Sequence, residues 1–393
     1  MNKEWISPNI IIGKEATGKF YFRRKDFENE VWKEIEKGNN VLLAAPRRVG
    51  KTSVMKFLTE NPKENYKLIF RNVQGIDDEK QFYKTIYDLI IICLDRFTKS
   101  KNIIHNYFKK MQISEISTTG FSIETKDIDY LYEINNLIPQ LEKDGENIIL
   151  LIDELPEVLH NLYLKGQKDT ALNILKNLRH WRQEEDFKKI QFVLAGSIGI
   201  HYVVNAIAGR SSDINDLYKI IYQPLTEDEF DNYITSVTKG ASIVYDEKLI
   251  KHLKSKIQYF VPYFINLILD EIDKAAIKKD DTSVAIENID EAFNKIIKNS
   301  DHFSDWKKRL KDYLPKNDFL FINEILTNIA HHEQINIQKI YDIAVKYEKE
   351  TEYMDFIKDL EQDGYIVESQ QNYIFISPFL KEYWKQNNPI PNA

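Results

Sequence analysis

The most constraining feature of this chain is an apolar strand pattern that runs directly into a short loop and the start of a helix. Residues 41–56 read VLLAAPRRVGKTSVMK: an apolar run, a loop with Pro and Gly, and then helix-forming residues. A loop that ends at a helix N-terminus directs backbone N–H groups and the positive end of the helix dipole toward one point. The pattern therefore predicts a strand–loop–helix unit with an anion-binding site at its bend.

The loop ends in Gly50-Lys51-Thr52, the ending of the phosphate-binding loop of nucleoside triphosphatases. Gly50 has no Cβ, so the backbone can approach a phosphate closely. Lys51 supplies a charge for the β- and γ-phosphates, and Thr52 supplies a hydroxyl to Mg²⁺. We expect the nucleotide to contact Pro46, Arg47, Arg48, Val49, Gly50, Lys51, Thr52 and Ser53.

Ala45 stands where the phosphate-loop motif begins with Gly. Because Ala tolerates a positive φ less well than Gly, we expect an ordinary backbone conformation at Ala45 and an intact loop. The alternative is a chance Gly-Lys-Thr in a helix cap, which the preceding strand disfavours.

Composition bounds the class of protein. A chain of 393 residues is too long for one ordinary core, so we expect two or three domains. The net charge of −7, from 54 basic and 61 acidic residues, favours neither a general nucleic-acid binder nor a disordered chain. Cys93 is the single cysteine, which fits a reducing compartment. Without an apolar leader or a run of about 18 uncharged apolar residues, we expect a soluble, cytoplasmic protein with no membrane partner.

Strands alternate with helices through the first 225 residues, which predicts right-handed crossovers and a three-layer α/β domain with a parallel sheet. The run NIILLI at 147–152 suits a strand buried on both faces. The expected strands are 40–44, 66–73, 147–152, 190–195 and 219–223, and the expected helices are 27–37, 51–59, 79–97, 170–182 and, with a break at Pro139, 129–144.

The strand signal stops near Thr226, and the sequence then indicates helices only as far as residue 298. A charged stretch at 301–316 ends at Pro315. Three helical patterns at 318–330, 336–347 and 351–363 precede two short strands at 365–368 and 373–376, the winged-helix arrangement. We therefore predict a P-loop NTPase core at 1–225 with an insertion at about 99–128, a helical lid at 226–300 and a winged-helix domain at 301–393.

Asp153-Glu154 follows the strand at 147–152 and matches the second signature of these triphosphatases. At the end of a parallel strand, Asp153 can hold the Mg²⁺ shell and Glu154 can polarise the attacking water. The alternative is a pair of solvated acids at a strand end. The distance of about a hundred residues from the phosphate loop favours the catalytic interpretation.

Three further positions carry weaker signals. Ser197 follows the strand at 190–195, where a polar side chain would lie between the two signature strands and sense the γ-phosphate; the alternative is a helix cap. Arg210 either stabilises transition-state charge across a subunit boundary or is a surface residue. Arg47 and Arg48 either contact a partner or neighbouring subunit or face solvent.

Together these segments resemble the prokaryotic AAA+ ATPases bordering the STAND class, namely archaeal-type ATPases with an origin-recognition-like core. The resemblance covers about residues 15–300, and the winged helix also fits. It rests on APRRVGKTS (45–53), ILLIDELPEVL (149–159), LKNLRHWRQ (175–183), FVLAGSIGI (192–200), INDLYKIIYQPL (214–225) and YFVPYFINLI (259–268).

The resemblance implies nucleotide and Mg²⁺ roles for Lys51, Thr52, Asp153 and Glu154, and a sensor 1 role for Ser197. It also implies a lid proline near the base, here Pro262. The family's lid often has Gly two residues before this proline, where this chain has Phe260. The segment at 22–25 likewise lacks the Gly and Glu of the family's base-contacting element.

The first interpretation is an ATP-driven switch, in which ATP and Mg²⁺ bind between core and lid and hydrolysis resets the winged helix. Such proteins often assemble, so a homo-oligomer or a protein partner is expected. A further possibility, by family analogy alone, is the ATPase component of an antiphage defence system.

The second interpretation is a DNA-binding loader or regulator, which charge disfavours. Residues 302–393 hold 11 Lys plus Arg and 15 Asp plus Glu, a net charge of −4. The segment 350–363, which includes the third helical pattern, has six acids against Lys358, a net charge of −5. Phosphate contacts supply most DNA affinity, so we favour a protein-interaction module. The basic residues that keep DNA open as an alternative are Lys307, Lys308, Arg309 and Lys311.

Overall fold

The computed structural model describes residues 4–95, 128–141, 147–196, 200–209 and 212–390. Ser197, Arg210 and nearly all of the expected insertion at 99–128 lie outside the described residues. The chain divides into two compact units, which are considered separately: residues 24–44 with 51–221, and residues 1–23 with 45–50 and 222–393.

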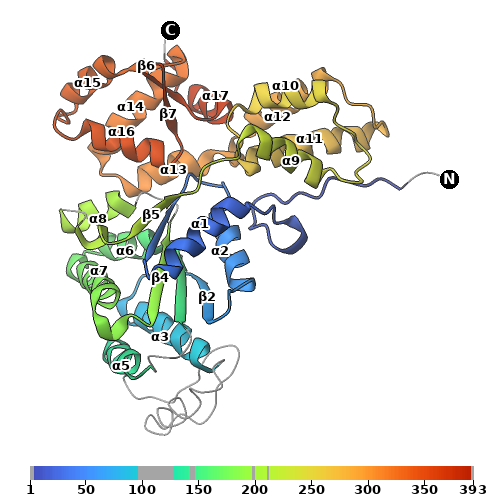
Figure 1. Ribbon diagram of the computed structural model, residues 1–393. Helices are drawn as coiled ribbons and strands as arrows, with labels where there is room; N and C mark the ends of the chain where they lie inside the picture. The colour runs from blue at the N-terminus through green and yellow to red at the C-terminus, as the bar shows by residue number, and fades with distance from the viewer. Residues whose placement is uncertain (1–3, 96–127, 142–146, 197–199, 210–211, 391–393) are drawn as a thin grey trace. The chain divides into compact units, whose positions relative to one another are not determined.

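The first unit is built on a five-stranded parallel sheet (Figure 1). Its strands are β1 (Val41–Ala44), β2 (Tyr66–Asn72), β3 (Asn147–Asp153), β4 (Ile190–Ala195) and β5 (Tyr218–Ile221), in the order β2-β3-β4-β1-β5. The strand positions predicted from the sequence are confirmed to within two residues. Because β4 lies between β1 and β3, the two strands that precede the signature motifs end beside the same neighbour.

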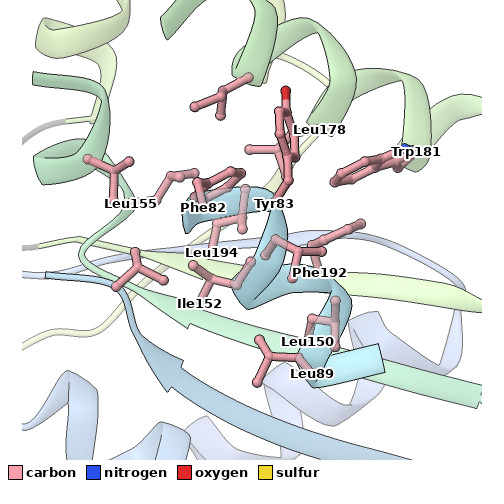
Figure 2. Close-up of a cluster of buried hydrophobic side chains, with 14 of the residues drawn as sticks. Phe82, Tyr83, Leu89, Leu150, Ile152, Leu155, Leu178, Trp181, Phe192 and Leu194 are labelled. Carbon is pink, nitrogen blue, oxygen red and sulfur yellow. The ribbon is translucent and has the colours of Figure 1, made fainter. Parts of the chain in front are cut away.

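Helices cover both faces of this sheet, which confirms the predicted three-layer α/β fold. Alternate residues of β3 and β4, such as Leu150 and Phe192, pack under Trp181 and Phe82 in a continuous apolar cluster (Figure 2). Helices α1 and α2 contact β1 and β2 from the other side (Figure 1). The helices are α1 (Lys25–Glu36), α2 (Lys51–Glu60), α3 (Glu79–Asp95), α5 (Tyr130–Leu137), α6 (Leu155–Leu164), α7 (Lys168–Gln183) and α8 (Ile200–Ala208).

The second unit contains the predicted run of helices after residue 226. They are α9 (Glu227–Val237), α10 (Glu247–Ile257), α11 (Pro262–Lys279) and α12 (Ile286–Lys298). Helix α9 begins with a capping box, in which the Thr226 side chain accepts from Glu229 N–H and the Glu229 side chain accepts from Thr226 N–H. The local sequence therefore fixes where this helix starts.

The same unit ends in helices and a small antiparallel sheet of order β6-β8-β7, which contains the two short strands predicted near residues 365–376. The charged stretch at 301–316 contains a helix, α13, which buries Trp306 and Leu310. The contacts group the helices of 226–300 with those of 301–393, and the proposed domain boundaries stay a prediction. The elements are α13 (Ser304–Tyr313), α14 (Lys316–His332), β6 (Ile335–Asn336), α15 (Ile337–Lys346), α16 (Tyr353–Gln362), β7 (Ile366–Ser369), β8 (Asn372–Phe375) and α17 (Pro378–Asn387).

Candidate nucleotide-binding site

Three strands of the sheet end at one level, and this level carries the predicted chemistry. Leu43 of β1 is paired with Ala195 of β4, and Ile152 of β3 is paired with Leu194. Lys51, at the start of α2, is 7% exposed and donates a hydrogen bond to the carbonyl of Gly196, which follows β4. The lysine ammonium is therefore held at the shared edge of β1, β4 and β3.

Thr52 and Asp153 meet at the same edge. The Thr52 hydroxyl donates to Asp153 Oδ2 over 2.5 Å, and the backbone N–H of Glu154 lies 3.1 Å from Asp153 Oδ1. Burial raises the pKa of the Asp153 carboxyl, whereas the Lys51 charge lowers it. A hydroxyl and a buried carboxylate in contact are the hard oxygen ligands that Mg²⁺ takes beside nucleotide phosphates, so these residues fit that ion.

Glu154 adopts a strained backbone conformation, with φ 63° and ψ 30° in the left-handed region. A non-glycine residue pays about 1–2 kcal/mol for this conformation. Such strain concentrates at functional sites, so it supports the catalytic role predicted for Glu154. Gly196 relieves crowding beside it, because a Cβ at that position would lie 2.4 Å from Pro156 at the start of α6.

The phosphate loop, residues 45–50, belongs to the second unit. Ala45 does not have a positive φ, which confirms the expected ordinary backbone. The left-handed positions of the loop are Arg48, with φ 63°, and Gly50, with φ 108°. Arg48 thus carries strain where glycine would carry none.

Arg47 and Arg48 are directed at side chains of the C-terminal helices. The Arg48 guanidinium carbon lies 4.1 Å from the centre of the Tyr263 ring, and Arg48 Nη2 lies 3.7 Å from Asp305 Oδ2. The Arg47 guanidinium lies 5.7 Å from the Trp306 ring centre. Both arginines therefore contact side chains of their own chain, and their predicted role toward a partner or a neighbouring subunit stays a prediction.

The ring contact of Arg48 outweighs its ion pair. Asp305 is 57% exposed, and an ion pair this exposed contributes at most about 1 kcal/mol. A partly desolvated cation over an aromatic face contributes about 1–2 kcal/mol. Burial and the nearby Arg309 lower the pKa of the Arg47 guanidinium, so that position carries an electrostatic cost.

The loop also packs against the turn that follows α16. Gly364 has φ +78°, and a Cβ there would lie 2.4 Å from the Pro46 Cβ. Val49 is 2% exposed and Ser53 is 6% exposed, while Pro262 is the first residue of α11. Nucleotide contacts of these residues stay a prediction.

The structure therefore brings Lys51, Thr52 and Asp153 together and adds a residue that the sequence did not indicate, Gly196. The aromatic and acidic contacts of Arg47 and Arg48 were also missed. The sequence did offer one sign of a buried contact, because Trp306 is a large apolar residue inside a charged stretch. The neighbouring residues, however, do not indicate which side chains Trp306 contacts.

The sheet order and the residues at its strand ends define a P-loop ATPase fold of the AAA+ class. The chain belongs to the AAA-like domain family, whose model matches residues 13–282. Among proteins of curated function, none matches the sequence. Within the described part of the chain, no helix has the length and apolar character needed to cross a membrane.

Two solved structures share the fold across nearly the whole chain. A Walker-type ATPase of Pyrococcus abyssi is 16% identical with a TM-score of 0.60, covering 94% of this chain and 98% of that one. The ORC2 protein of Aeropyrum pernix, solved as ADPNP-ADP complexes, is 13% identical with a TM-score of 0.52, covering 98% of this chain and 96% of that one.

Proposed function

We propose that this protein is a Mg²⁺-dependent ATPase of the AAA+/STAND type that works as a switch, coupling its nucleotide state to assembly or to a protein partner through the winged helix. The observation that carries the proposal is the 2.5 Å contact between Thr52 and Asp153, which joins the two signature motifs. The solved relatives are a Walker-type ATPase and a protein bound to ADPNP and ADP, which supports ATP as the ligand.

Each residue of the site has a defined task in this proposal. Lys51 neutralises charge on the β- and γ-phosphates, and Thr52 and Asp153 hold Mg²⁺. When bound, the ion offsets the negative charge of the phosphates. Glu154 orients and polarises the attacking water. Ser197 and Arg210 keep their predicted roles as γ-phosphate sensor and as the residue that completes a neighbouring subunit's site.

Switching follows from the loss of one group. ATP and ADP differ by the γ-phosphate, so only contacts to that group can distinguish the two states of the protein. Hydrolysis would therefore release whatever conformation the γ-phosphate stabilises. An oligomer or partner complex that forms with ATP and dissociates with ADP is the expected outcome.

The winged helix has features of a protein-interaction surface. Ile337, Tyr341 and Val345 recur every four residues on α15 and are 41%, 41% and 48% exposed, forming an apolar stripe. Amphipathic helices can dock on other chains through such a stripe, which supports a protein partner. The acidic segment at 350–363, with six acids against one lysine, opposes a nucleic-acid backbone.

DNA binding remains the second candidate because of the basic residues on α13. One of them is already engaged: Lys307 Nζ donates to Asn388 Oδ1 over 2.5 Å. This leaves fewer cations for phosphates, so we rank a protein partner above DNA.

Phosphate-release assays combined with mass photometry test the proposed function. The protein is measured with ATP, with ADP, without nucleotide, and with ATP plus duplex DNA. Hydrolysis together with an ATP-dependent change in mass supports the switch. A DNA complex at physiological salt would favour the loader, and absence of both nucleotide binding and hydrolysis would overturn the ATPase assignment.

A further inference from the structure

We propose that Arg47 and Arg48 form a latch between the phosphate loop and helix α13, and that nucleotide phosphates compete with this latch. The inference rests on the proposed function, because it requires a nucleotide in the loop. It assigns to the two arginines a coupling role in addition to any phosphate contact.

Helix α13 is firmly built into the second unit. Trp306 is 1% exposed, and its backbone carbonyl accepts a 2.8 Å hydrogen bond from the Tyr365 hydroxyl. The Trp306 ring also lies 6.5 Å from the ring of Phe264 on α11. Trp306 therefore contacts both α11 and Tyr365, the residue directly before strand β7.

The conformation of the loop depends on this attachment. Arg48 holds a left-handed backbone conformation that its side chain does not favour. Its contacts with Tyr263 and Asp305 are the visible compensation. If these contacts are lost, nothing offsets the cost of the left-handed conformation at Arg48, and the loop backbone can move to a less strained conformation.

Phosphate oxygens are stronger partners for these guanidiniums than the groups that hold them in the structure. Arg47 Nη1 and Arg48 Nε are buried and make no hydrogen bond to any described residue. Asp305 is a single, largely exposed carboxylate, whereas a triphosphate offers several anionic oxygens in the geometry that Arg binds well. Nucleotide binding is therefore expected to draw Arg48 from Asp305 and loosen α13.

Coupling between two binding events is reciprocal, so weakening the latch must strengthen nucleotide binding. Asp305→Asn removes the acidic partner of Arg48 with little change in shape. We expect it to raise the affinity for a non-hydrolysable ATP analogue by about threefold, the range of a weak exposed ion pair. Asp312→Asn is the matched control, because Asp312 lies exposed on the same helix.

Hydrogen–deuterium exchange measures directly whether nucleotide binding loosens α13, which an affinity measurement does not show. In the wild-type protein, the analogue is expected to speed exchange in residues 304–313 by about fivefold, the lower end of typical coupling. Arg48→Gly, which relieves the backbone strain and removes the guanidinium, is expected to abolish this response. Glycine is compatible with the φ of 63° at this position, so a lost response in this variant is not caused by a backbone that cannot adopt the native φ.

The outcomes separate the two proposals. Binding of the analogue without any change in α13 exchange, or equal affinities for Asp305→Asn and Asp312→Asn, would overturn the latch alone. Failure of the wild-type protein to bind ATP or its analogue would overturn the proposed function and the latch with it.

Discussion

The two ends of the phosphate-binding segment are held in different ways. Lys51 and Thr52 are fixed by polar contacts at the edge of the sheet, to the Gly196 carbonyl and to Asp153. Arg47 and Arg48 are fixed by aromatic rings and one exposed acid from the C-terminal helices. One end thus holds the residues proposed to bind phosphate and Mg²⁺, and the other holds the arginines proposed to couple nucleotide binding to helix α13.

Removing the lysine should have the largest effect. Lys51→Ala deletes the charge expected to meet the β- and γ-phosphates, and we expect ATP affinity to fall about 100-fold or more, as for a lost partner in a buried charge pair. Calorimetry measures the change. Lys56→Ala, on the same helix, is the control and should bind normally. Unchanged affinity in Lys51→Ala would refute the phosphate-loop assignment.

Glu154→Gln separates binding from turnover. The variant keeps the shape of the side chain but loses the base, so we expect ATP to bind while hydrolysis slows about 100-fold. Steady-state phosphate release gives the rate. Glu157→Gln, on the first turn of α6, should hydrolyse ATP at the wild-type rate. A wild-type rate in Glu154→Gln would remove this residue from catalysis.

Asp153→Asn should weaken Mg²⁺-dependent nucleotide binding about tenfold or more, because it removes the acidic ligand of the ion. Titration of Mg²⁺ at fixed nucleotide measures this loss. If the variant binds Mg²⁺–nucleotide as the wild type does, Asp153 does not hold the ion.

The same carboxyl makes stability depend on pH. Its pKa in the folded protein is raised above the ordinary value of 3.8, so the folded state binds the proton more tightly than the unfolded chain. The stabilising contribution of the Asp153 carboxyl to the free energy of unfolding is therefore fully present below pH 3.8. It is lost as the pH rises through the pKa of the folded state. Without nucleotide, Asp153→Asn should be the more stable protein at neutral pH, measured by thermal unfolding.

The smallest effect should come from the arginine end of the loop. Gly364→Ala places a Cβ against Pro46, whereas Gly240→Ala, at the same φ of +78°, meets nothing within 4 Å. Both should lose about 1 kcal/mol from backbone strain. Chemical denaturation should show a larger decrease in the free energy of unfolding for Gly364→Ala than for Gly240→Ala. Only Gly364→Ala should also change the affinity for nucleotide. Equal decreases in the free energy of unfolding would mean that Pro46 moves aside at little energetic cost.

The sheet and its motifs were predictable because their signals are local. The run at 147–152 is apolar at every position but the first, and Asp153-Glu154 follows at once. Parallel topology then requires that residues at strand ends gather at one edge, which is why Thr52 and Asp153 were expected to meet.

The attachment of the phosphate loop to α13 was not predictable. Helix α13 is mostly charged, with Trp306 and Leu310 as its buried residues, so its periodicity is weak. The partners of Arg47 and Arg48 lie more than 200 residues away in the sequence, and only tertiary packing selects them. Strand β6, with two residues, is too short to leave a pattern.

The order of the sheet also has a consequence for synthesis on the ribosome. Strand β1 emerges early, but both of its neighbours, β4 and β5, begin at residue 190 or later. A nascent chain therefore carries the apolar segment VLLA without its sheet partners until most of the α/β unit has been translated. The sheet edge that carries the candidate nucleotide site is completed late, and the apolar segment is a target for chaperones during elongation.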